Sequence, residues 1–163
     1  MNFEQYQDYL INTATSLLSI DSTSGFTAKV TDYLIDTVKE LGYPVYKNNI
    51  GNVIVTVEGE DDSEPVALSA HVDTLGLMVR SITSDGMLMI TSIGSPLLPS
   101  LDGEYCNIHT RDGRVYTGTI LSLSPAVHVF PDASTRDRDE QNMAVRIDEI
   151  VHSKEDVEAL GIH

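Results

Sequence analysis

The sequence predicts an α/β section in its first half and a small β-barrel in its second half. Apolar residues recur every three or four positions up to residue 41, which is typical of amphipathic helices. The segment Pro65–Ala70 is short and continuously apolar, and it therefore predicts a fully buried strand of a parallel sheet. After residue 76, short strand-like segments alternate with Asp-Gly turns, and no long helical pattern interrupts them, which favours a barrel.

Two helices are expected first. The apolar stripe of the first helix consists of Phe3, Tyr6, Leu10, Ala14, Leu17 and Leu18. Asn2 and Gln5 resemble a capping box at its start. A second stripe runs from Phe26 to Leu41, and Gly42 is well placed to end that helix in a left-handed conformation.

Three strands are expected to complete the first section. Val45–Lys47 and the β-branched segment Val53–Val57 flank a turn, and Pro65–Ala70 follows an acidic loop. A parallel sheet needs cover on both faces, and two helices are too few to supply it. We therefore expect this α/β section to be incomplete.

The second section is punctuated by two hairpin signals. Its expected strands are 77–82 and 87–91 around Asp85-Gly86, 105–110 and 115–120 around Asp112-Gly113, and a last strand with Val145 and Ile147. A polar loop from Pro125 to Asn142 precedes that last strand. A short final helix is expected, capped at Ser153 and ended by Gly161.

Composition narrows the function classes. The 163 residues include 25 acidic and 10 basic ones, a formal net charge of −15, which argues against nucleic acid or anionic membrane as partner. Cys106 is the single cysteine, so an internal disulfide and a cysteine-based zinc site are excluded, and a buried inert thiol is expected. The first residues lack the features of a signal peptide, and no apolar run is long enough to span a membrane, so we expect a soluble cytoplasmic protein.

The candidate chemistry lies at His71 and Asp73, directly after the predicted buried strand. Open α/β sheets place ligands beyond the carboxyl ends of their strands. A histidine there, with a carboxylate two residues on, suits a metal ligand and the acid that orients it. From the residues alone, a core histidine bonded to a neighbouring backbone group is an equally good interpretation.

The remaining histidines do not complete a metal site by their spacing. His109 is expected to be a partly exposed strand residue, and His128 to be packed or hydrogen-bonded between two valines. His152 is expected at the surface, and His163 at a mobile chain end. None forms the His-x-x-x-His pair of a helical zinc site. The acidic stretch Asp132–Glu140 is interrupted by Arg136 and Arg138, which favours a solvated loop with internal ion pairs over a calcium site.

Several short motifs, in this order, resemble one known family. They are Ser24-Gly25, Gly51-Asn52-Val53, the run from Leu68 to Val79 that contains His71-Val72-Asp73, Ile93-Gly94, Asp112-Gly113, Val127-His128-Val129 and the run from Asn142 to Asp148. The family is that of the dinuclear metallo-aminopeptidases that include glutamyl and deblocking aminopeptidases, the TET-type peptidases. Mild departures occur at Val72, at Thr74-Leu75 and at Ser95, where many members have Met, Glu-Ile and a second Gly.

The resemblance implies a function and a division of the chain. Residues 1–74 correspond to the N-terminal part of the α/β catalytic domain, residues 75–152 to an inserted PDZ-like β-barrel for dimerisation, and residues 153–163 to a helix leading back to the catalytic part. The family binds two divalent metal ions, zinc or cobalt, and releases N-terminal residues from peptides. Its members assemble through the β domain into dimers and then into hollow dodecamers. His71 matches a metal ligand, and Asp73 matches the acid that orients it.

The same resemblance limits what these 163 residues are expected to do. Family chains are longer, and the other metal ligands and the catalytic glutamate lie in the later part. We therefore expect this chain to be a truncated piece, inactive by itself. The alternative is a non-catalytic oligomerisation or interaction module, and a truncated reading frame is a third possibility.

Overall fold

A computed structural model describes residues 3–61 and 63–163, so Asn2 of the predicted capping box lies outside the described residues. The chain divides into two compact units, Met1–Leu75 and Gly76–His163, and each is described by itself. Within the described residues, no helix has the length and apolar character needed to cross a membrane.

The N-terminal unit begins with the two predicted helices. A single 3₁₀ turn, η1 (Phe3–Tyr6), leads into α1 (Gln7–Leu18), and α2 (Ala28–Glu40) follows after a turn. Gly42, with φ at 83°, follows the C-cap of α2 in the left-handed region, where its lack of a Cβ avoids strain. The helical part of the prediction is confirmed, including its end signal.

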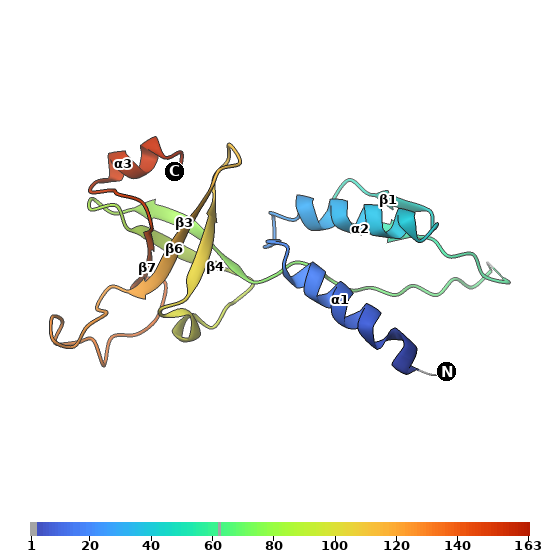
Figure 1. Cartoon of the computed structure of the whole chain (residues 1–163), viewed down its shortest axis with the longest axis horizontal. Helices are drawn as coiled ribbons and strands as arrows, with labels where there is room; N and C mark the ends of the chain where they lie inside the picture. Colours follow the sequence, from blue (N-terminus) through green and yellow to red (C-terminus); the bar gives the residue numbers. More distant parts are fainter. Residues whose placement is uncertain (1–2, 62) are drawn as a thin grey trace. The chain divides into compact units, whose positions relative to one another are not determined.

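A small antiparallel hairpin completes the ordered part of this unit. Strands β1 (Val45–Lys47) and β2 (Val53–Val55) pair with each other and contact α2 (Figure 1). The Asn48 side chain closes the turn, since its Oδ1 accepts hydrogen bonds from the backbone N–H groups of Ile50 and Asn52. Two of the three expected strands are confirmed, and the second ends at Val55, two residues earlier than expected.

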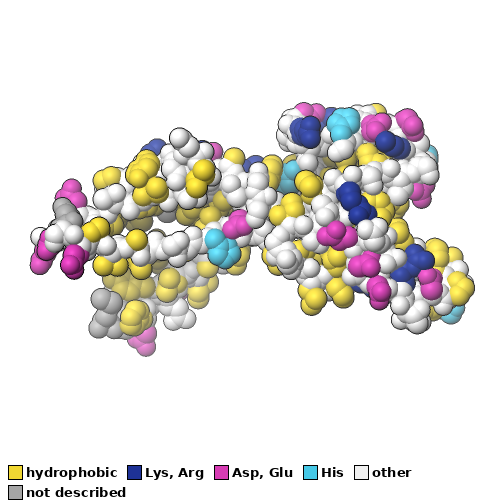
Figure 2. Space-filling view, turned by 180° about the vertical axis from the view of Figure 1, so that it is seen from behind, with side chains coloured by type: hydrophobic (Ala, Val, Ile, Leu, Met, Phe, Trp, Pro, Cys, Tyr) yellow, Lys and Arg dark blue, Asp and Glu magenta, His cyan; other side chains and the backbone are white. Residues whose placement is uncertain are grey.

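The prediction of a third strand at residues 65–70 is wrong. The segment 65–70 has no strand geometry, and its apolar side chains are exposed, with Val66 at 90% and Leu68 at 97%. A strand needs a hydrogen-bonded neighbour for its backbone groups, and among residues 3–61 and 63–163 no strand pairs with this segment. Figure 2 shows other apolar side chains at the surface of the same unit, where Val30 is the one buried hydrophobic residue among those described.

The C-terminal unit is built on a five-stranded antiparallel sheet that curls on itself (Figure 1). Its strands are β3 (Gly76–Ile82), β4 (Leu88–Ile93), β5 (Tyr105–His109), β6 (Val115–Ser122) and β7 (Met143–Ile147). The order is β3-β4-β7-β6-β5, so the last strand in sequence lies between β4 and β6 and joins the two hairpins. The expected strands are confirmed, and the sheet contributes most of the buried core: Leu88, Ile90, Ile108, Ile120, Met143, Val145 and Ile147.

Both hairpins turn in the same way. In each, a threonine N–H donates to the carbonyl four residues on: Thr83 to Met87 at 2.9 Å and Thr110 to Arg114 at 2.9 Å. The threonine hydroxyl also donates to the aspartate two residues later, Asp85 or Asp112. The sequence pattern Thr-x-Asp-Gly-x therefore supplies its own turn through local hydrogen bonds.

Two further elements close the C-terminal unit. A 3₁₀ turn, η2 (Leu98–Leu101), precedes β5. The helix α3 (Lys154–Ala159) is N-capped by Ser153, whose Oγ accepts a hydrogen bond from the N–H of Asp156 at 3.2 Å. The caps predicted at Ser153 and Gly161 are thus confirmed, since Gly161 has φ at 84°.

The polar loop before β7 is held by charged groups. Arg136 pairs with Asp132 at 2.7 Å, which confirms an internal ion pair. Arg138 pairs instead with Asp102 at 3.1 Å, outside the loop. Glu140 accepts the N–H of Ser92 at 2.6 Å and so ties the end of the loop to β4.

Candidate functional site

His71 and Asp73 form a contacting pair in the N-terminal unit. The Nδ1 atom of His71 lies 3.0 Å from Oδ1 of Asp73. The imidazole is 86% exposed, while the Asp73 side chain is 37% exposed. The ring is therefore held by one carboxylate and otherwise faces solvent, so the interpretation of His71 as a packed core histidine is wrong.

The charge state of Asp73 indicates which imidazole nitrogen is available. The Ser24 hydroxyl donates to Oδ2 of Asp73, and this bond, together with the one to His71, lowers the pKa of the Asp73 carboxyl below its usual value. An ionised carboxylate only accepts, so Nδ1 of His71 carries the proton in this contact. In the neutral ring, the lone pair of Nε2 then faces outward, as a metal ligand requires.

Backbone contacts place the segment that carries both residues. The N–H of Thr74 donates to the carbonyl of Ser22 at 3.0 Å, within an isolated parallel bridge between Thr23 and Thr74. The Ser22 hydroxyl, which is fully buried, donates to the carbonyl of Val72 at 3.1 Å. The turn after α1 therefore holds residues 72–74 although the preceding residues 65–70 are unpaired.

In the described part of the chain, His71 is the candidate metal ligand and Asp73 the candidate acid that would orient it. Within the described residues, no three His, Cys, Asp or Glu side chains gather closely enough to hold a metal ion. A catalytic zinc takes three protein ligands. The residues present therefore fit one arm of a metal site and do not fit a complete one.

The other histidines lie apart from such a constellation. His128, His152 and His163 are exposed, and His109 is half-buried in β5. His128 was expected to be packed or hydrogen-bonded, and its packing is wrong, because Val127 and Val129 on either side belong to an exposed loop.

Cys106 has no reactive character. Burial raises the pKa of its thiol to about 11, and the negative charge of Asp148 adds to the shift. A thiol of this kind stays protonated near neutral pH and is a poor nucleophile. A buried inert thiol was expected: the structure leaves Cys106 half-buried, and its raised thiol pKa agrees with low reactivity.

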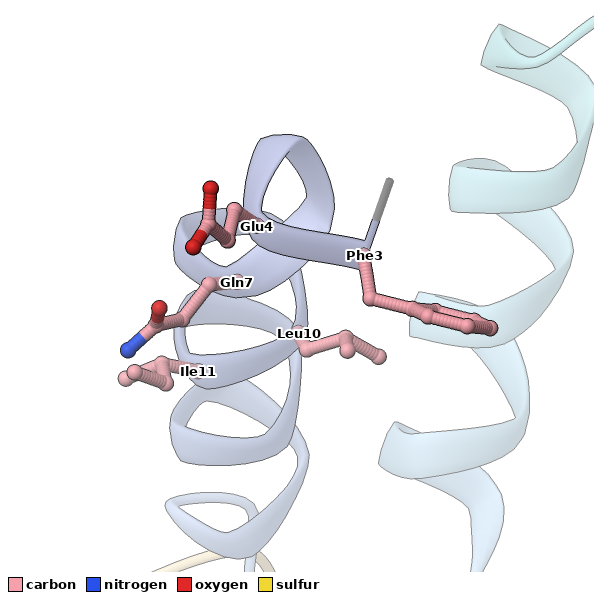
Figure 3. Close-up of a pocket in the computed structure, with 5 residues that line it drawn as sticks. All are labelled: Phe3, Glu4, Gln7, Leu10 and Ile11. Atoms are coloured by element: carbon pink, nitrogen blue, oxygen red, sulfur yellow. The ribbon is translucent and has the colours of Figure 1, made fainter. Parts of the chain in front are cut away.

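A shallow apolar hollow lies on the surface of η1 and α1, lined by Phe3, Glu4, Gln7, Leu10 and Ile11 (Figure 3). Glu4 is its one acidic lining residue, and the close-up shows Phe3 and Leu10 directed to one side and Gln7 and Ile11 to the other. The hollow offers no pair of groups for acid–base work, and none of its residues is a predicted site residue.

Sequence reasoning did not assign a role to the hydroxyls of Ser22 and Ser24. Both lie in the turn between α1 and α2, and only Ser24 belongs to one of the sequence motifs. Their partners lie about 50 positions away, at Val72 and Asp73. No local pattern predicts such a pairing, because it depends on how the turn and the later segment meet.

Comparison with known proteins gives the site a context. A family model described as M42 glutamyl aminopeptidase matches residues 51–163. The protein YhfE of Bacillus subtilis (strain 168), whose aminopeptidase designation is itself provisional, is 45% identical over 146 residues. The match covers 90% of this chain and 42% of YhfE, so the chain spans less than half the length of that relative.

Solved structures agree with this match. Aminopeptidase APDkam598 from the archaeon Desulfurococcus kamchatkensis superposes with a TM-score of 0.82 at 27% identity, over 97% of this chain and 42% of that one. The TET1 peptidase of Pyrococcus horikoshii superposes with a TM-score of 0.75 at 26% identity, over 92% of this chain and 43% of its own. That peptidase assembles into a tetrahedron or a large octahedral shell.

Proposed function

Because the chain belongs to the M42 glutamyl aminopeptidase family, we propose that it forms the N-terminal part of a metal-dependent aminopeptidase acting on peptides. The observation that carries this proposal is the His71–Asp73 pair, with its outward Nε2, in a chain whose residues 51–163 match that family.

In this proposal each residue has one task. His71 would hold one of two divalent ions through Nε2, and Asp73 would accept the hydrogen bond from Nδ1–H and so fix the ring. When bound, such ions polarise the substrate carbonyl and lower the pKa of a coordinated water. Zinc metalloproteases use a glutamate as general base, and we expect such a glutamate, with the remaining ligands, to come from the region that YhfE has in addition.

The test is a chimera in which residues 1–163 replace the matching part of YhfE. We expect it to release p-nitroaniline from aminoacyl-p-nitroanilides in the presence of zinc or cobalt, and to lose that activity with a strong chelator. The His71→Ala substitution should lower turnover by at least about a hundredfold, the upper range for disturbing a metal site.

Two controls give this test a clear outcome. YhfE itself shows that the substrate and the metal are suitable, and His152→Ala removes an exposed histidine of the C-terminal unit. A chimera that stays active with His71→Ala would contradict the proposal. Activity of the 163-residue chain by itself would equally contradict it, since the described residues do not assemble a complete metal site.

A second proposal concerns the C-terminal unit. We propose that residues 75–152 form a PDZ-like barrel through which copies of the chain associate. Among the described residues, β3 and β5 are the edge strands of the sheet, and each has one unpaired side. Met78 on β3 is 55% exposed, and Tyr105 on β5 is 72% exposed. Such edges favour pairing with another chain, and the assembly of the TET1 peptidase supports the same idea.

Light scattering after size exclusion tests this association. We expect the 163-residue chain to be a dimer or larger at micromolar concentration, and Tyr105→Lys on the β5 edge to shift it toward monomer. A strict monomer at high concentration would rule the proposal out. A chain that associates and remains inactive in the chimera would instead favour the interaction module over the enzyme.

A further inference from the structure

We propose that Ser24 is a positioning residue for His71: its hydroxyl holds the Asp73 carboxylate, which in turn fixes the tautomer and direction of the imidazole. The significance of this relay for metal binding rests on the proposed function. The relay itself consists of contacts within this chain.

The relay uses both oxygens of one carboxylate. Oδ2 of Asp73 accepts the Ser24 hydroxyl, and Oδ1 faces Nδ1 of His71 at 3.0 Å. The imidazole is 86% exposed, so little packing holds it. A carboxylate bonded at one oxygen only is free to rotate away from the ring, and the Ser24 bond at the other oxygen removes this freedom.

Contacts between residues 22–23 and residues 72–74 place Ser24 opposite Asp73. Thr23 and Thr74 form a parallel bridge, and the Ser22 side chain and carbonyl bind Val72 and Thr74. Ser22 and Ser24 flank the bridge residue Thr23 in the turn after α1, and their hydroxyls bind the Val72 carbonyl and the Asp73 carboxylate, respectively. Ser22 holds the backbone of the ligand segment, while Ser24 holds its carboxylate.

A merely structural serine and a positioning serine differ in one observable. Loss of a structural hydroxyl lowers stability and leaves the protonation pattern of the folded His71 ring unchanged. Loss of a positioning hydroxyl changes the ratio of the two neutral tautomers of that ring, because Nδ1–H loses part of its fixed acceptor.

Long-range ¹H–¹⁵N NMR spectra of the 163-residue chain, without metal and at about pH 8.5 where imidazoles are neutral, measure this ratio. The wild type should carry the His71 proton mainly on Nδ1. Ser24→Ala should shift the ratio toward Nε2–H by about threefold, as expected for a partly exposed charge-assisted bond. Ser24→Thr keeps a hydroxyl and should restore the wild-type ratio.

Ser19→Ala is the matched control, because Ser19 donates to the Thr15 carbonyl in the same unit and is exposed. A wild-type ring protonated mainly on Nε2 would overturn the relay, and so would an unchanged ratio in a folded Ser24→Ala chain. If Ser24→Ala unfolds the N-terminal unit, the relay is tested by the other two spectra: the wild type and Ser24→Thr should both carry the His71 proton mainly on Nδ1. Since no metal is present, an inactive chimera with the expected tautomers would reject the proposed function and leave the relay standing.

Discussion

Gly118 lies in the middle of β6, between Cys106 on β5 and Ile147 on β7, and has no room for a side chain. A Cβ added there would lie 2.7 Å from Cγ1 of Val145 and 2.8 Å from the carbonyl oxygen of Arg146. Val145 is 4% exposed within the core, and the Arg146 carbonyl belongs to the neighbouring strand backbone. Neither neighbour moves easily, because interiors are close-packed.

Gly118→Ala should therefore lower the free energy of unfolding by about 2–3 kcal/mol, the upper part of the range for overpacking a core. Urea titration followed by circular dichroism measures it, because sheet and helix signals report unfolding. Gly59→Ala is the matched control: the nearest atoms to its added Cβ lie 3.9 Å away, so its midpoint should stay near that of the wild type. A Gly118→Ala chain within about 0.5 kcal/mol of the wild type would refute this account of how β5, β6 and β7 pack.

Three other outcomes follow from single contacts. Ser153→Ala removes the acceptor for the Asp156 N–H and should lower stability by about 1 kcal/mol, measured by the same urea titration. Cys106, whose pKa is raised to about 11, should react slowly with a thiol-specific disulfide reagent at about pH 8 and quickly once urea unfolds the chain; equal rates would contradict its burial. The Ser92 N–H lowers the pKa of Glu140, so the unfolded carboxyl binds protons at higher pH than the folded one. The stabilisation by the Glu140 carboxylate is present above about pH 4.3 and lost as pH falls through the pKa of the folded state. Glu140→Gln should therefore make the urea midpoint depend less on pH in the acid range. An unchanged pH dependence would show that Glu140 does not contribute to acid unfolding.

Elements with local signals were predictable from the sequence. The Asp-Gly turns after Thr83 and Thr110 form through hydrogen bonds within five residues, so the residues that specify them are adjacent. Gly42 and Ser153 likewise end and begin their helices through their own conformation or side chain. Short-range physics was sufficient in each case.

Features that depend on distant partners were not predictable in the same way. Residues 65–70 have the composition of a buried strand, yet burial requires neighbours, and the described residues supply none. The order of the sheet, with β7 between β4 and β6, also arises from a contact between segments far apart. For the site, His71 and Asp73 were identified from their spacing, while the partner of Asp73 at Ser24 became visible only from the fold.

The most direct test of the central claim is the position of the metal relative to His71. Anomalous scattering from a crystal of the zinc-loaded chimera gives that position without reference to activity. We predict a zinc peak about 2.1 Å from Nε2 of His71, with Nδ1 of His71 still hydrogen-bonded to Asp73. Zinc bound at a site from which His71 is absent would contradict the claim that this chain supplies a ligand of the aminopeptidase centre.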